Sequence, residues 1–166
     1  MHKLKNKNLT QKITGFTLVE LITVLLIGSL LLAWGVPNYR DFKMRKQIST
    51  AANEVVYSLT QARAEAVRYG TDVRVSPAGG DWQNGWTTTS IGVDGNADVV
   101  LAIQDPIDPN LILTQVGALI GDVVFNRIGG LTGNSAGRFE IKSSDVAGFD
   151  RAVAISLTGS SKVVKI

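Results

Sequence analysis

The stretch from Gly15 to Pro37 constrains this chain more than any other part of the sequence. It is mostly apolar and contains a single ionisable side chain, Glu20. At about 1.5 Å of rise per residue, a helix of about 20 residues crosses a hydrocarbon core of about 30 Å. A carboxylate inside such a helix is costly and usually marks function. The sequence therefore predicts a membrane-spanning helix over residues 16–37, in which Glu20 has a functional role.

The basic character of the chain belongs to the residues before Gly15. The whole sequence has 17 Lys and Arg against 14 Asp and Glu, a net charge of +3. Lys3, Lys5, Lys7 and Lys12 all precede Gly15 and no acidic residue does, so the remaining chain has 13 basic against 14 acidic side chains, or −1. Because positive flanks stay on the cytoplasmic side of a membrane helix, we expect a cytoplasmic N-terminus and a periplasmic C-terminal domain.

The sequence contains no set of residues that suggests an enzyme. It has no cysteine, and its one histidine, His2, lies in the basic segment. These two facts exclude Ser-His-Asp and Cys-His mechanisms and an ordinary zinc site. Neither Ser160-Ser161-Lys162 nor the scattered carboxylates form a recognisable catalytic set. We therefore expect a non-catalytic protein without a cofactor or a metal.

Two ordinary explanations of residues 1–37 fit poorly. A secretory signal has a shorter apolar region of about 7–15 residues and small residues at its cleavage site. Here the run is longer, and Leu31-Leu32-Ala33 places a bulky side chain where a small one is needed. A plain membrane anchor has the right length, but it explains neither Glu20 nor the Gly15-Phe16 boundary.

The residues Gly15-Phe16-Thr17-Leu18-Val19-Glu20 resemble the processing site of type IV pilins and type II secretion pseudopilins. The resemblance implies that residues 1–15 are a leader peptide, which a prepilin peptidase removes after Gly15. It also implies that the peptidase methylates the new amino group of Phe16. In this family, a glutamate at the position of Glu20 pairs with the N-terminal amine of a neighbouring subunit during assembly. Opposite charges attract strongly in a low-dielectric medium, and either one alone would stay uncompensated.

A helix of a different kind is expected after the apolar run. Pro37 has no N–H and clashes with the carbonyl one turn earlier, so we expect a helix kink over residues 33–37. Residues 38–70 are then predicted to form an amphipathic helix that Gly70 ends. Its apolar face consists of residues spaced by three and four: Ile48, Ala52, Val55, Leu59, Ala62, Ala66 and Tyr69.

Residues 71–166 read as short β-type runs separated by Gly, Asp, Asn and Pro. This pattern after one long helix predicts an α+β protein, in which the helix packs on an antiparallel β domain. The predicted strands are Thr71–Ser76, Trp86–Ile91, Val99–Ile103, Leu111–Val116, Val123–Ile128, Gly137–Ile141, Arg151–Leu157 and Lys162–Ile166.

The helix and the β domain contain a further set of motifs: Ala52-Asn53-Glu54, Ala62-Arg63-Ala64-Glu65-Ala66, Trp82 with Gly85-Trp86, Val124-Phe125-Asn126 and Gly129-Gly130. Through these motifs the chain resembles, within the pilin-like proteins, the GspH/FimT group of minor subunits, which includes FimU-like proteins. The tryptophans among them also have a structural explanation, because large aromatic side chains commonly cap small β cores.

The segment Asp94-Gly95-Asn96-Ala97-Asp98 begins like a calcium-binding loop. Val99 stands where such a loop needs glycine, and Asp105 stands where it needs glutamate. Because Asp-Gly-Asn between two strands is a sufficient turn signal, a turn is expected here.

Some FimT-like subunits bind DNA through a Gly-Arg-x-Arg-like stretch near the C-terminus. This chain has Gly159 at the corresponding place, but both arginines are absent and only Lys162 and Lys165 remain. Scattered lysines give weak, salt-sensitive contacts to phosphate.

We therefore expect a minor pilin or pseudopilin of a type IV pilus or a type II secretion system. Its expected partners are other subunits, a prepilin peptidase, an inner-membrane assembly platform and membrane lipid. It would be a single-pass inner-membrane protein until it enters a pilus or pseudopilus. One alternative is a DNA-binding minor pilin for natural transformation. Another is a membrane-anchored periplasmic domain unrelated to filaments, which would keep its leader.

Overall fold

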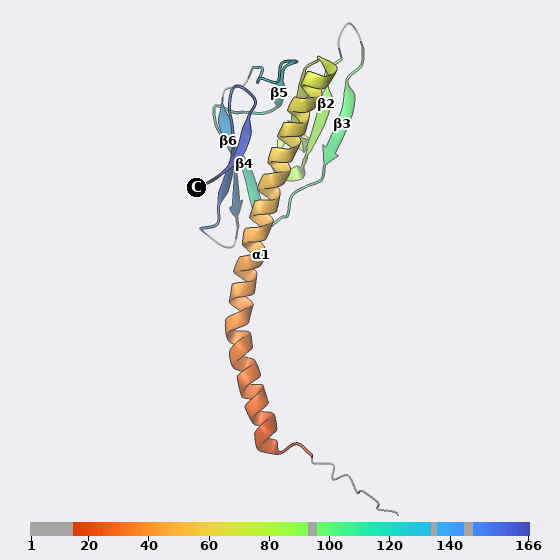
Figure 1. Cartoon of the computed structure of the whole chain (residues 1–166). Coiled ribbons are helices and arrows are strands. Elements are labelled where there is room, and N and C mark those ends of the chain that lie inside the picture. Colours follow the sequence, from red (N-terminus) through yellow and green to blue (C-terminus); the bar gives the residue numbers. More distant parts are fainter. Residues whose placement is uncertain (1–14, 93–95, 134–135, 145–147) are drawn as a thin grey trace, which may run out of the picture. The chain divides into compact units, whose positions relative to one another are not determined.

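The computed structural model describes residues 15–92, 96–133, 136–144 and 148–166. The chain divides into two compact units, one ending at Tyr39 and the other formed by Arg40–Ile166. The helix α1 runs from Leu18 to Tyr69 without a break and belongs to both units (Figure 1). It contains Pro37 in its interior, and the expected kink at this proline stays a prediction.

The second unit is built around the part of α1 that follows Arg40. Buried residues on this part recur every three or four positions, as the amphipathic pattern predicts. Gly70 ends the helix as expected, with φ +67° and its N–H bonded to the Ala66 carbonyl at 3.0 Å. The prediction is wrong for Tyr69, which is 48% exposed because Ala66 is the last residue of the stripe that the domain covers. The buried residues of α1 are Met44, Ile48, Ala51, Ala52, Val55, Ser58, Leu59, Ala62 and Ala66.

In the described part of the chain, each of the eight predicted runs overlaps one strand, and these strands form two antiparallel sheets of four. The prediction of an α+β protein is thus confirmed. The first sheet has the order β3-β2-β1-β5, made of β1 (Val73–Pro77), β2 (Trp86–Ser90), β3 (Val99–Gln104) and β5 (Val123–Phe125). The second has the order β4-β6-β7-β8, made of β4 (Leu111–Gly117), β6 (Gly137–Ser143), β7 (Arg151–Ile155) and β8 (Ser161–Lys165).

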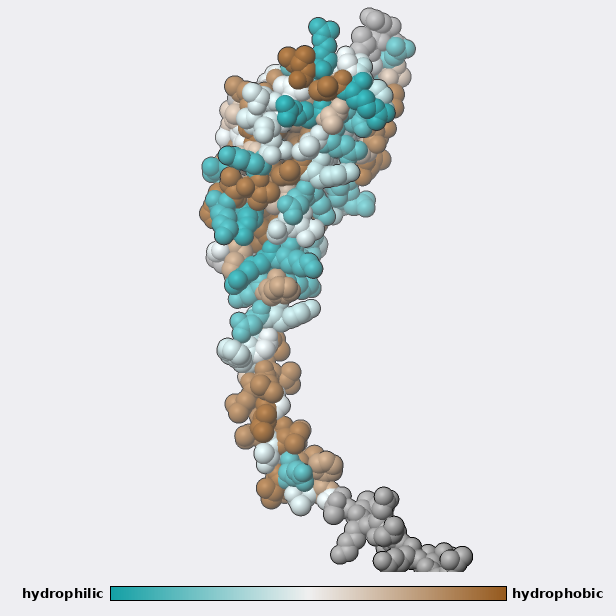
Figure 2. Space-filling view, in the orientation of Figure 1, coloured by the Kyte–Doolittle hydropathy of each residue, from teal (hydrophilic) through white to brown (hydrophobic). Residues whose placement is uncertain are grey.

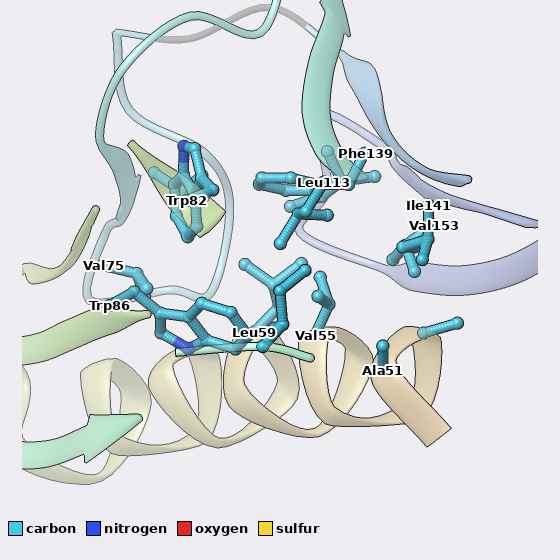
Figure 3. Close-up of a cluster of buried hydrophobic side chains, with 14 of the residues drawn as sticks. Ala51, Val55, Leu59, Val75, Trp82, Trp86, Leu113, Phe139, Ile141 and Val153 are labelled. Carbon is cyan, nitrogen blue, oxygen red and sulfur yellow. The ribbon is translucent and has the colours of Figure 1, made fainter. Parts of the chain in front are cut away.

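One hydrophobic core joins α1 to both sheets (Figure 3). Alternate residues of each inner strand point into it, such as Val73 and Val75 of β1, which are fully buried. Trp82 and Trp86 lie in this core with ring centroids 5.8 Å apart, and the Trp82 and Phe139 rings form a T-shaped pair with centroids 4.7 Å apart. The two tryptophans therefore have the structural role that their sequence context suggested.

A short 3-10 turn, η2 (Trp82–Asn84), lies between β1 and β2 in the chain and is hydrogen-bonded to β4 of the other sheet. The Asp81 carboxylate accepts a hydrogen bond from the Gln83 N–H at 2.9 Å, which caps the turn. The Gln83 side chain then acts as a strand partner for β4, because its amide donates to the Leu111 carbonyl and accepts from the Leu113 N–H. These two hydrogen bonds satisfy backbone groups of β4 on the edge that has no neighbouring strand among the described residues.

Candidate functional site

The helix α1 has a defined start two residues after the Gly15-Phe16 boundary. The Thr17 side-chain oxygen accepts a hydrogen bond from the Glu20 N–H at 3.2 Å, and the Thr17 carbonyl accepts the first helical bond, from the Leu21 N–H, at 3.1 Å. Thr17 is therefore the N-cap residue, and Glu20 stands at the third helical position. Our sequence reasoning missed Thr17, although Thr-x-x-Glu before an apolar run is a recognised capping signal.

Glu20 lies on the surface of the first turn of α1. A negative charge there is favoured by the helix dipole, which gives Glu20 a local role beside the one implied by the resemblance. No side chain in the described ranges pairs with its carboxylate. The carboxylate is therefore free to meet a cation from outside the described chain.

Gly15 has no structural reason to be glycine within the described part of the chain. A Cβ placed on Gly15 would have no atom within 4 Å, and Gly15 is not among the glycines with positive φ. No steric contact with the described residues therefore requires glycine at this position.

The first unit exposes its apolar side chains all along α1. An 18-residue window of the helix has a mean hydropathy of 2.2 and no buried residue, so this segment is long and apolar enough to cross a membrane. Figure 2 shows this part of the helix as mostly brown, with paler groups between and a teal patch near the start of the helix. Exposure of this kind in water is unfavourable, which indicates an apolar environment for this segment.

Residues of the GspH/FimT resemblance meet at one place in the second unit. The Arg63 side chain on α1 donates from Nε to the Gly129 carbonyl at 2.8 Å. Asn126 holds the same loop, because its side-chain oxygen accepts from the N–H groups of Ile128 and Gly130 at 3.1 and 2.9 Å. The residues that carry the resemblance in this region thus shape the loop after β5 and hold it against α1.

The two candidate DNA-contacting lysines are not brought together. Lys162 and Lys165 are both exposed on β8, where they pair with Ala154 and Arg151 of β7. Because successive side chains of a strand alternate between its faces, residues three apart point to opposite faces of the sheet. The two lysine side chains therefore cannot contact the same phosphate group.

The calcium-like segment lies partly outside the described residues, which omit positions 93–95. The described Asp98 uses its carboxylate to accept the Gly92 N–H at 2.9 Å, a contact that suits a turn. Among the described residues, no group of His, Cys, Asp or Glu could hold a metal ion.

A further charged cluster stands on β6. The Glu140 carboxylate is paired on both sides, with Arg138 at 2.6 Å and with Lys142 at 2.8 Å. Hydrogen bonds from Lys142 and then from Arg138 hold the pKa of Glu140 below its ordinary value of 4.5, and they outweigh the opposing effect of burial. The opposite charges of this cluster partly cancel, as is typical of an ion-pair network that stabilises a fold.

Comparison with known proteins identifies two segments of the chain. Residues 51–159 match the family described as type II transport protein GspH. Residues 11–36 match the prokaryotic N-terminal methylation motif, a range that includes Gly15, Phe16 and Glu20. A fimbrial protein of Pseudomonas aeruginosa is 30% identical over 113 residues, which are 66% of this chain and 72% of that protein.

Solved structures share the fold. The type IV minor pilin FimU of Pseudomonas aeruginosa aligns with a TM-score of 0.63 and 22% identity, over 75% of this chain and 92% of FimU. The minor pseudopilin EpsH from the type 2 secretion system of Vibrio cholerae aligns with a TM-score of 0.56 and 14% identity, over 71% of this chain and 96% of EpsH. With the two family matches, this fold shows that the chain belongs to the GspH family of minor pilins and pseudopilins, structural subunits that assemble with other pilin-type subunits.

Proposed function

We propose that this minor subunit is held in the inner membrane by α1, loses residues 1–15, and enters a type IV-type filament through a contact made by Glu20. The observation that carries the proposal is the exposed apolar part of α1, in which Glu20 is the one carboxylate and has no partner in the described residues. The subunit acts as a structural part in this proposal and not as an enzyme.

The partner of Glu20 is the N-terminal amine of a neighbouring subunit. Removal of the leader creates a positive charge at Phe16, four residues before Glu20 and at the same end of the helix. When apolar helices pack side by side, both charges leave water, and each is compensated only if it meets the other. The pair therefore sets the axial register between neighbouring helices.

Processing supplies that amine. Gly15 is not required by the fold of the described chain, which supports a requirement imposed by a peptidase. The lysines that precede Gly15 favour a cytoplasmic N-terminus, so the cut would occur on the cytoplasmic side of the membrane, where a prepilin peptidase and an assembly platform would act. Methylation of the Phe16 amine would follow, which keeps its positive charge.

The fimbrial relative favours a type IV pilus over a secretion pseudopilus as the filament. If this subunit belongs to the pilus, pili sheared from cells should contain it, and its deletion should reduce piliation and leave protein secretion unchanged. The opposite pattern would assign it to a type II secretion system.

Replacing Glu20 tests the assembly role directly. Glu20→Ala should leave cleavage after Gly15 largely intact but should block incorporation, because the neighbouring amine would be buried without a counter-charge. Mass spectrometry of the mature N-terminus, which should be methyl-Phe16, reports on cleavage, and a filament pull-down reports on incorporation.

The matched control is Ser29→Ala, which removes another polar group from the same apolar segment. The Ser29 hydroxyl is bonded to the Leu26 carbonyl inside its own helix at 2.8 Å, so this variant should assemble normally. Normal incorporation of Glu20→Ala would show that the register role is wrong. An uncut leader in the unaltered chain would contradict the processing step.

A further inference from the structure

The hydrogen bond at Thr17 determines where α1 can begin. In a longer helix, the Phe16 carbonyl would accept the N–H of the residue four positions later, which is Glu20. In the structure that N–H is directed to the Thr17 side-chain oxygen at 3.2 Å. The cap thus competes with extension of the helix towards Gly15, and residues 15–17 are non-helical.

This boundary matters for the bond between Gly15 and Phe16. The carbonyl group of a peptide bond inside a helix accepts a hydrogen bond from the next turn, and the plane of the bond runs along the helix axis. A peptidase binds its substrate more readily as exposed, irregular backbone. Phe16 is 83% exposed and lies outside the helix, and nothing in the described chain lies within 4 Å of a Cβ at Gly15.

We propose that Thr17 is a positioning residue for leader removal: its side-chain oxygen takes the Glu20 N–H and so keeps the Gly15–Phe16 bond out of α1. This inference rests on the proposed function, in which a peptidase cuts that bond. Hydrolysis breaks the link between the Gly15 carbonyl carbon and the Phe16 nitrogen. Water gives its hydroxyl group to the carbon and its proton to the nitrogen, and Thr17 takes no part in the chemistry.

The test compares cleavage rates of full-length chains in membranes that contain a prepilin peptidase. The fraction of pulse-labelled chain that begins at Phe16 is followed over time by mass spectrometry. Thr17→Val keeps the shape of the side chain but removes the accepting oxygen, so the Glu20 N–H becomes available to the Phe16 carbonyl. Cleavage should slow by about fivefold, the population shift expected for loss of one N-cap. Thr17→Ser keeps the oxygen and should be cut within about twofold of the unaltered rate.

A matched control is available in the same helix. Thr23→Val makes the same chemical change at a hydroxyl that donates to the Val19 carbonyl at 2.8 Å within α1, so it should be cleaved at the unaltered rate. The inference is overturned if Thr17→Val is cut as fast as the unaltered chain, if Thr17→Ser is as slow as Thr17→Val, or if Thr23→Val slows cleavage equally. Failure of the unaltered chain to be cut after Gly15 would instead remove the proposed function, and this inference with it.

Discussion

At two positions of the second unit, the backbone of another segment comes so close that only glycine fits. Gly159 has φ +77°, and a Cβ on it would lie 2.1 Å from the Gly129 carbonyl oxygen, which is also the acceptor for Arg63. Gly85 has the same kind of constraint, with φ +85° and a Cβ position 2.1 Å from the Gln104 carbonyl oxygen. At both sites the side chain is excluded by sterics as well as by backbone conformation.

This constraint predicts that Gly159→Ala is strongly destabilising. The substitution would separate the loop at Gly129 from the turn before β8, and it would also break the Arg63 hydrogen bond. Gly121→Ala is the control, because Gly121 has φ +69° but open space around its Cβ position. The control should cost about 1–2 kcal/mol of unfolding free energy for the left-handed backbone alone, and Gly159→Ala should cost clearly more. Urea denaturation of residues 40–166 would measure the difference, and equal losses would contradict the proposed clash.

Glu20 and Gly15 show which site residues the sequence alone could reveal. Both stay predictions, and both could be singled out because the motif spacing is local, whereas the cap at Thr17 was overlooked although its signal is local too. Arg63 and Gly129 could be noticed only as parts of a resemblance, since their hydrogen bond joins residues 66 positions apart. No pattern along the chain indicates that contact.

At the scale of elements, strand positions followed from the sequence but strand neighbours did not. Alternation and turn residues mark where each strand lies and which side faces the core. They do not say that β5 joins β1 while the preceding β4 pairs with β6 in the other sheet. The predicted run Val123–Ile128 also proved too long, because Asn126 closes a turn directly after Phe125.

The outer face of β6 carries a pH-dependent contribution to stability. Because the pKa of Glu140 is lowered in the folded state, its ion pairs stabilise the fold above pH 4.5, and this contribution is lost as the pH falls through the lowered pKa. Glu140→Gln should therefore be less stable than the unaltered chain near pH 7, and the gap should narrow in acid. Thermal unfolding at a series of pH values checks this prediction, and a gap that stays constant would contradict it.

The two units of the molecule suit different surroundings, water for one and an apolar medium for the other. Among the described residues, every buried core residue lies at or beyond Met44, within the second unit. The described residues of the first unit form an apolar part of α1, and none of them belongs to that core. The residues that form the folded core and the residues that suit a membrane therefore lie in separate parts of the chain.

This division predicts that residues 40–166 fold alone as a soluble protein, with a cooperative thermal transition seen by circular dichroism. A shorter fragment, residues 47–166, should also fold but melt at a lower temperature. It lacks the buried Met44 and also Arg45, whose guanidinium stacks 4.2 Å from the centre of the Phe149 ring. A fragment of residues 40–166 that unfolds without a cooperative transition, while the full chain in detergent unfolds cooperatively, would contradict this prediction. In that case α1 before Arg40 stabilises the domain, and the two units are not independent.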